Sequence, residues 1–257
     1  MKINTTSILG VNVSAINYDL ALTFIKQQLT SKNKTYICVA AVHLIMECQK
    51  NAELKNGVNR AGLITPDGMP LVGLLKLYGH SVVERVYGPT LLQKICFFAQ
   101  KNNYRIFLLG GHPGQSQQVA TRLKKDFSNI KLIDAVDTPN PEKSVADTKL
   151  IQKINQSKAD IVFIGMGCPH QERFMIHNRP KLSPTLLIGV GAAFDFLANR
   201  KKQAPEFIQQ SGFEWLFRLI QEPKRLWYRY TIVNIQFVQL IIIQIIHDFV
   251  FKHYAKK

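Results

Sequence analysis

The sequence is poor in cysteine, in acidic residues and in the motifs that mark common metal enzymes. Its 257 residues include four cysteines, which form no CxxC pair and have no histidine at zinc-finger spacing. A zinc finger and a disulfide framework are therefore excluded. Residues 1–5 lack the apolar segment of a signal peptide. We expect a cytosolic protein with reduced thiols.

Acidic charge is scarce relative to basic charge. The chain has 17 Asp and Glu against 33 Lys and Arg, a formal net charge of +16. Such a balance favours a polyanionic partner, either nucleic acid, an anionic membrane face or a phosphate-bearing substrate. Hydrophobic residues make up 46% and charged residues 19%, which excludes disorder and coiled coil. The length suits one large α/β domain or one domain with an appendage.

Several catalytic and nucleotide-binding motifs are also missing. No glycine turn completes GxGxxG with an acidic residue about 20 positions later, and no GxxxxGK[ST] phosphate loop is present. No GxSxG turn supplies a hydrolase nucleophile. The seven histidines form no HExxH pair, and no DxD carboxylate pair is available for a nucleotide-sugar metal ion. We therefore expect any sugar-nucleotide chemistry here to proceed without a metal or another cofactor.

Short apolar runs alternate with helix-like segments along most of the chain. Strands are expected at Thr35–Ala40, Ala61–Ile64, Tyr104–Leu109, Ile130–Asp134, Asp160–Gly165 and Thr185–Val190. Helices are expected at Asp19–Leu29, Leu91–Lys101, Gln115–Asp126 and Ala146–Gln156, with a loop over 137–141. Strands separated by helices indicate βαβ units. The predicted fold is a Rossmann-like α/β domain, with a mostly parallel sheet covered by helices on both faces.

Glycine-rich turns follow three of the predicted strands. The first contains Gly110, Gly111 and Gly114 and leads into a helix, and the others lie at 165–169 and 189–195. A glycine turn lets a ligand approach the backbone, and the next helix N-terminus offers free N–H groups to a phosphate. Each turn alone is weak evidence. Together, along one sheet edge, they predict a nucleotide-sized crevice in which these glycines contact substrate.

One carboxylate stands out in a tight turn. Asp67 follows an apolar strand and lies between Pro66 and Gly68. An Asp-Gly pair is often only a turn, yet an aspartate at the carboxyl end of a strand is placed like a general base. Arg85 lies eighteen residues further on in another loop bounded by glycine and proline. Its alternative interpretation is an ordinary surface charge.

The composition changes near residue 198, so we divide the chain into an α/β catalytic domain at 1–198 and an appendage at 199–257. From residue 200 onward, ten Lys and Arg face four Asp and Glu, and aromatic residues alternate with arginines. The uncharged run Ile232–Ile246 is shorter than the roughly 20 residues of a membrane span and contains four amides. We expect a helix at the membrane interface. Packing on protein and a true span are the alternatives.

Motifs in a fixed order resemble a known family. They are Pro66-Asp67-Gly68, Glu84-Arg85-Val86 with Gly88, Gly110-Gly111-x-Pro113-Gly114, Pro169-x-Gln171-Glu172, Gly189-Val190-Gly191-x-x-Phe194-Asp195-Phe196, Ala204-Pro205, Glu214-Trp215-x-x-Arg218-Leu219 and Glu222-Pro223-x-Arg225. The ordered set resembles the WecG/TagA/CpsF family of bacterial glycosyltransferases over roughly residues 8–230.

The resemblance implies an inverting, metal-independent enzyme, peripheral on the inner face of the cell membrane. Such enzymes move N-acetylmannosamine, its uronic acid or another hexose from a UDP-sugar to an undecaprenyl-diphosphate-linked saccharide in cell-surface polysaccharide synthesis. Asp67 matches the family's catalytic base. The other implied substrate-binding residues are Arg85, Gln171, Glu172 and Asp195 in the domain, and Arg218, Arg225 and Arg229 in the appendage, which is thought to close over the site.

Several positions depart from the family pattern, among them His170, Gln203 and Asn199, where the family commonly has Lys, Arg and Gly. The stretch Val39-Ala40-Ala41 stands where the family commonly has Thr-x-Asn, so the hydrogen bonds of those side chains are missing and substrate choice is open. A catalytically inactive family member is one alternative. A basic module that binds RNA or another polyanion is a second, although the sequence has no RNP-like aromatic pattern, and we expect no nucleic-acid partner. The resemblance also suggests a homo-oligomer.

Overall fold

The computed structural model describes residues 3–205, 207–208 and 212–251. The last six residues, with three of the basic charges assigned to the appendage, lie outside this part. Six strands form one parallel sheet in the order β4-β3-β8-β7-β5-β6. Their bounds are β3 (Thr35–Ala40), β4 (Leu63–Pro66), β5 (Arg105–Gly110), β6 (Lys131–Val136), β7 (Ile161–Gly165) and β8 (Leu186–Gly189). All six predicted strands are confirmed to within two residues.

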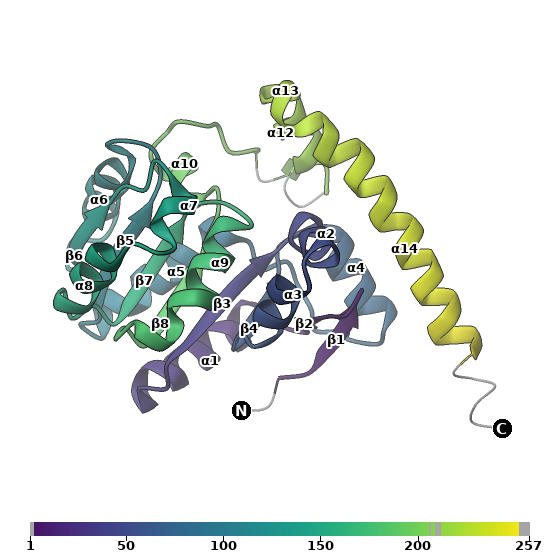
Figure 1. The fold of residues 1–257 in the computed structure, drawn as a ribbon, viewed down its shortest axis with the longest axis horizontal. Coiled ribbons are helices and arrows are strands. Elements are labelled where there is room, and N and C mark those ends of the chain that lie inside the picture. The colour runs from purple at the N-terminus through teal and green to yellow at the C-terminus, as the bar shows by residue number, and fades with distance from the viewer. Residues whose placement is uncertain (1–2, 206, 209–211, 252–257) are drawn as a thin grey trace.

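Helices cover both faces of this sheet, as predicted (Figure 1). One face packs on α1 (Tyr18–Ser31), α5 (Gly88–Lys101), α6 (Gln115–Asp126) and α10 (Ala193–Leu197). The other packs on α2 (Val42–Lys50), α3 (Ala52–Asn59), α4 (Met69–Leu77), α8 (Thr148–Gln156) and α9 (His170–Asn178). The central strands are buried on both sides, which explains their nearly continuous apolar sequences. The edge strand β6 is partly exposed and correspondingly polar.

A small hairpin was not predicted. Strands β1 (Thr5–Ile8) and β2 (Val11–Ser14) pair antiparallel in a separate sheet. Leu9 and Gly10 join them, both with positive φ, the backbone that a two-residue hairpin turn requires. The predicted loop at 137–141 also ends slightly early, because Pro141 is the first residue of the short helix α7 (Pro141–Ser144). Another short element, η1 (Arg179–Lys181), follows α9.

The C-terminal appendage is helical. After α12 (Glu214–Gln221) come α13 (Pro223–Tyr228), η2 (Arg229–Val233), α14 (Asn234–Ile246) and η3 (His247–Phe251). Residues 223–249 form one helix of 27 residues that is long and apolar enough, by length and composition, to cross a membrane. The helix therefore begins before the uncharged run Ile232–Ile246. In Figure 1 this helix extends past α2 and α4 as a long yellow rod, and α14 packs on α2.

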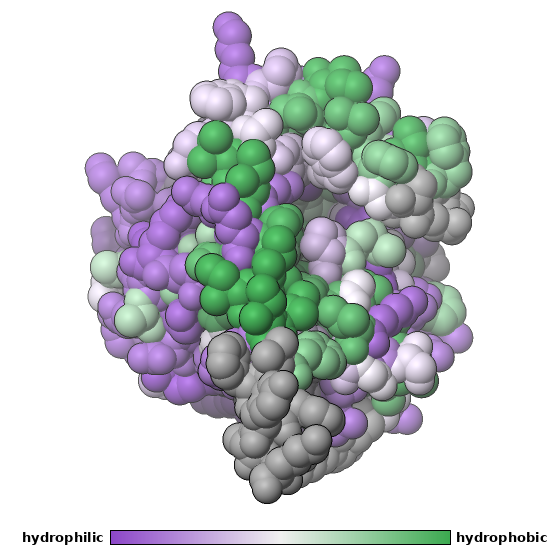
Figure 2. Space-filling view, turned by 90° about the vertical axis from the view of Figure 1, so that its right-hand side faces the viewer, coloured by the Kyte–Doolittle hydropathy of each residue, from purple (hydrophilic) through white to green (hydrophobic). Residues whose placement is uncertain are grey.

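The long helix is apolar on both of its sides. Val233, Phe237 and Ile241 are buried in the domain's core. On the opposite side, Ile235, Val238, Ile242, Ile243, Ile246 and Phe249 are exposed. Figure 2 shows a hydrophobic band that runs down this face of the molecule between hydrophilic regions. One helix thus docks on protein and presents a second apolar surface to the outside.

Candidate active site

A cavity of about 620 Å³ opens at the carboxyl edge of the parallel sheet. The first or second residue after each of the strands β3, β4, β5, β7, β8 and β6 lines it: Ala41, Asp67, Gly111, Met166, Val190 and Thr138. Parallel strands place their carboxyl ends at one edge, so residues far apart in sequence meet there. The crevice predicted from the glycine turns is present at that edge.

Asp67 lies in the wall of this cavity. Its backbone N–H donates to the carbonyl of Ala40, 2.8 Å away, which continues the pairing of β4 with β3 by one residue. The side chain is 22% exposed, and its Oδ1 lies 3.2 Å from Nη2 of Arg85. Burial raises the pKa of Asp67 above its usual value, the positive charge of Arg85 opposes that shift, and Glu214 adds to it.

Arg85 joins Asp67 to the appendage. Its Nη1 lies 2.7 Å from Oε2 of Glu214, the first residue of α12. The hydroxyl of Tyr87 donates to the other Glu214 oxygen at 3.1 Å, and the Arg85 guanidinium lies 4.2 Å from the centre of the Tyr87 ring. Glu214 and Tyr87 were missed as site residues. The motif Glu214-Trp215 contributes to the family resemblance, but nothing in the sequence indicates that Glu214 forms an ion pair with Arg85.

Gln171 and Glu172 occupy different places although they are neighbours. Gln171 lines the cavity, its Oε1 accepts from the N–H of Gly191 at 2.9 Å, and its Nε2 donates to Oε1 of Glu172 at 2.8 Å. Glu172 is fully buried and does not line the cavity. Burial raises its pKa to about 7. Within this structure Glu172 orients the Gln171 amide, and its contact with substrate stays a prediction.

The glycine turn after β5 has a structural explanation. Gly110 has a φ of +129°, and a Cβ there would lie 2.6 Å from the carbonyl carbon of Gly165 on the neighbouring strand. Gly111 lines the cavity, whereas Gly110 and Gly114 do not. The Asp137 carboxylate accepts from the N–H groups of Gly114 and Ser116 at 2.6 and 2.8 Å.

The Asp137 carboxylate, an anion that the protein itself supplies, therefore occupies the N-terminus of α6. Hydrogen bonds from Ser116 and Gly114 lower the pKa of Asp137, although its burial opposes the shift. Two of the N–H groups expected to cradle a phosphate, those of Gly114 and Ser116, are bonded to this carboxylate. Substrate binding by the three glycines of this turn stays a prediction.

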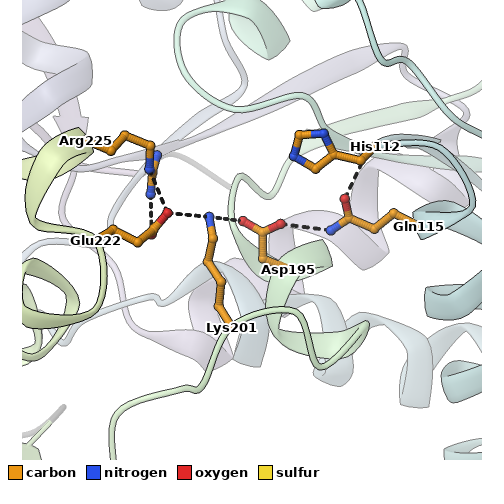
Figure 3. A network of polar contacts seen from close by, with 6 residues as sticks. All are labelled: His112, Gln115, Asp195, Lys201, Glu222 and Arg225. Carbon is orange, nitrogen blue, oxygen red and sulfur yellow. Dashed lines mark hydrogen bonds and ion pairs between the residues drawn. The ribbon is translucent and has the colours of Figure 1, made fainter.

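Cations concentrate on the appendage side of the cavity. Five line it: Arg200, Lys201, Arg218, Arg225 and Arg229. A polar network links two of them, Lys201 and Arg225, to the domain (Figure 3). Lys201 Nζ lies 2.5 Å from Asp195 and 3.3 Å from Glu222, which also pairs with Arg225. Asp195 in turn accepts from Gln115 at 2.9 Å.

The structure thus brings most of the predicted site residues to one cavity. Asp67, Gly111, Gln171, Asp195, Arg218, Arg225 and Arg229 line it. Arg85 does not line this cavity. It contacts Asp67 and lines a second, smaller cavity. Within the described ranges, no three His, Cys, Asp or Glu side chains gather in a way that could hold a metal ion. Metal independence stays a prediction.

Comparison with protein families identifies the chain. The model of the glycosyl transferase WecG/TagA/CpsF family matches residues 6–249, which include both the α/β domain and the described appendage. The chain belongs to this family. Membership supports a glycosyltransferase that acts in cell-surface polysaccharide synthesis.

Proposed function

We propose that the protein transfers a sugar from a UDP-sugar to a hydroxyl of an undecaprenyl-diphosphate-linked saccharide, with inversion and without a metal. N-acetylmannosamine, its uronic acid or another hexose is the sugar moved. The observation that carries the proposal is the position of Asp67, a carboxylate in the wall of a cavity that five cationic side chains also line. Family membership supports the reaction class.

Asp67 is the general base in this mechanism. It takes the proton of the acceptor hydroxyl as that oxygen attacks the anomeric carbon of the donor. The new C–O bond forms while the bond to UDP breaks, and UDP leaves with the bonding electrons. A raised pKa brings a carboxylate closer to the working pH, where a general base is more effective. Arg85 limits the rise of this pKa, because its positive charge favours the ionised carboxylate.

The arginines stabilise the leaving group. UDP develops negative charge on its diphosphate, and charge-assisted hydrogen bonds from guanidinium groups are strong enough to stabilise it. Arg218, Arg225 and Arg229 line the cavity on its appendage side. The N-terminus of α6 is bonded to Asp137, so we place the diphosphate near the appendage rather than at that helix.

The acceptor lipid gives the exposed apolar side of α14 a role. We propose that this side lies on the inner face of the cell membrane, with the long helix parallel to the surface. Its aromatic and basic neighbours, among them Trp227, Tyr228 and Lys224, suit headgroups and lipid phosphates. The domain would then meet a membrane-bound acceptor without leaving the surface.

The proposal is tested by product mass. Purified protein is given a panel of UDP-sugars with an undecaprenyl-diphosphate-N-acetylglucosamine analogue, and UDP release and lipid-linked product are measured with and without EDTA. We expect one donor to give a mass increment that EDTA does not affect. Asp67→Asn should lower turnover by about 10²–10⁴-fold.

A matched control is Asp126→Asn, which removes a surface carboxylate paired with Arg122 on α6 and should leave turnover unchanged. Product formation by Asp67→Asn at the wild-type rate would remove Asp67 from the mechanism. Loss of activity in EDTA that magnesium restores would contradict metal independence.

A further inference from the structure

A second, smaller cavity of about 120 Å³ meets the larger one at Asp67. Four residues line both: Ala41, Asp67, Arg218 and Arg229. The two cavities therefore share the carboxylate and two of the appendage arginines. Every other residue of the larger cavity belongs to it alone.

The two cavities differ in chemistry. Glycine turns and strand ends line the larger one together with most of the cations. The smaller one lies between the start of α2, the turn around Gly68 and the appendage, and its own lining residues include His43, Met69, Pro70, Trp215 and Tyr230. It thus combines two aromatic side chains with five charged ones, Asp67, Arg85, Glu214, Arg218 and Arg229, and Arg85 forms ion pairs with both Asp67 and Glu214. A hydroxyl-rich ring with apolar C–H faces suits such a combination of aromatic faces and paired charges.

The reaction requires two sites on either side of the anomeric carbon, with the base on the acceptor side. In an inverting displacement the acceptor oxygen attacks opposite the leaving group, so acceptor and UDP approach the anomeric carbon from different sides. The volume and cations of the larger cavity suit a nucleotide diphosphate. The smaller one, which also borders Asp67, is then available for the acceptor sugar. This step rests on the proposed function.

Two side chains of the smaller cavity are available for recognition. Trp215 is 40% exposed although its neighbour Glu214 is buried in the ion pair with Arg85. Its ring meets Tyr230 edge to face at 6.0 Å, a contact that favours this position of the ring. His43 lines the smaller cavity with its ring, which is held by a hydrogen bond to the backbone of Cys168, and its Nδ1 is buried away from the cavity. Burial and the charge of Arg229 lower the pKa of His43 to about 4, which leaves a neutral ring at physiological pH.

We infer that the smaller cavity holds the terminal sugar of the acceptor, with Trp215 stacking on the sugar ring and the His43 ring packing beside it. The glycosyltransferase reaction then joins substrates from two cavities across Asp67. The lipid part of the acceptor leaves past η2, where the apolar side of the long helix begins. Neither Trp215 nor His43 touches the reacting atoms, so both act as specificity residues.

Calorimetry with two separate probes tests the inference. One probe is UDP. The other is N-acetylglucosaminyl diphosphate with a short alkyl chain, measured with and without UDP present. For Trp215→Leu and His43→Ala we expect the Kd of the acceptor probe to rise about tenfold or more, while the Kd of UDP changes less than twofold. Trp215→Phe keeps an aromatic face and should recover most of the affinity.

Controls separate this inference from the proposed function. Trp227→Leu removes another exposed tryptophan of the appendage that lines neither cavity and should leave both constants unchanged. His112→Ala alters the larger cavity only and should weaken UDP alone. Unchanged acceptor binding in both Trp215→Leu and His43→Ala, weakened UDP binding in them, or no binding of the acceptor probe to folded wild type would overturn the inference. Absence of UDP binding to wild type would overturn the proposed function instead.

Discussion

The carboxylate of Glu214 lies 2.7 Å from the guanidinium of Arg85, and the same guanidinium contacts Asp67 on its other side. The appendage is thereby connected to the proposed base through one side chain. Glu214 is the first residue of α12, so its ion pair with Arg85 also places the next residue, Trp215, beside the smaller cavity. A substitution of Glu214 or of Arg85 is therefore expected to change the pKa of Asp67.

Glu214→Gln should move the acidic limb of activity to lower pH. The negative charge of Glu214 raises the pKa of Asp67, and its removal lets the carboxylate lose its proton at a lower pH. Because a base works only when deprotonated, activity then extends further into acid. The measurement is kcat/KM against pH. Glu222→Gln, whose carboxylate pairs with Lys201 and Arg225, should not move the limb. An unchanged or raised limb in Glu214→Gln would contradict the electrostatic link.

Arg85→Lys should move the same limb in the opposite direction. Lysine has a single ammonium and cannot bridge Asp67 and Glu214 as the guanidinium does. With the positive charge held less closely to the carboxylate, burial raises the pKa of Asp67 further. We also expect the free energy of unfolding to fall by about 1–3 kcal/mol, because two poorly solvated carboxylates lose hydrogen bonds. Chemical denaturation and the pH profile measure the two effects. A variant with wild-type values in both would refute the role given to Arg85.

Asp137→Ala should destabilise the fold without weakening UDP binding. The carboxylate caps α6, and the loss of such a cap costs about 1 kcal/mol. Because hydrogen bonding lowers the pKa of Asp137, its contribution is present above the ordinary aspartate value near 4 and is lost as pH falls through the lower folded value. The stability difference between wild type and variant should therefore vanish in acid. A large fall in UDP affinity would place the diphosphate at this helix after all.

The sheet was predictable because its central strands are apolar on both faces and each ends in a turn. The hairpin β1–β2 was not, since its turn contains Leu9 at a positive φ, a backbone conformation that leucine rarely adopts. Asp67 could be proposed from its place after a strand, and Gln171 from the resemblance to the family. The partnership of Arg85 with Glu214 could not, because only the docking of the appendage brings residues so distant in sequence together.

The glycine turn shows a different limit. Its sequence has the composition of a phosphate cradle, and nothing local reveals that Asp137 fills it from the end of the neighbouring strand. Local patterns predict which backbone N–H groups are free of their own helix. They do not predict which carboxylate another strand delivers to those groups.

The orientation of the long helix leads to a prediction about membrane contact. Gln244 ties the far end of α14 to the domain, since its Oε1 accepts from Leu9 N–H at 2.7 Å and its Nε2 donates to the Ser7 carbonyl at 2.8 Å. Tyr78 donates to Asp248 at 2.8 Å. A helix that crossed a bilayer would lose these bonds, whereas a helix that lies on the surface keeps them and uses its exposed side.

Ile242→Asp combined with Ile246→Asp should therefore abolish most liposome binding. Both side chains are about half exposed, so the change costs little folding stability but puts two charges where the helix would enter the headgroup region. We expect co-sedimentation with anionic vesicles to fall at least about tenfold, while the melting temperature stays near that of wild type. Phe97→Asp, which places a charge at a half-exposed apolar site on α5, is the matched control and should bind like wild type. Equal binding by the double variant would mean that another surface meets the membrane, whereas unfolding of the variant would mean that this face packs on protein, as in contact with a second subunit.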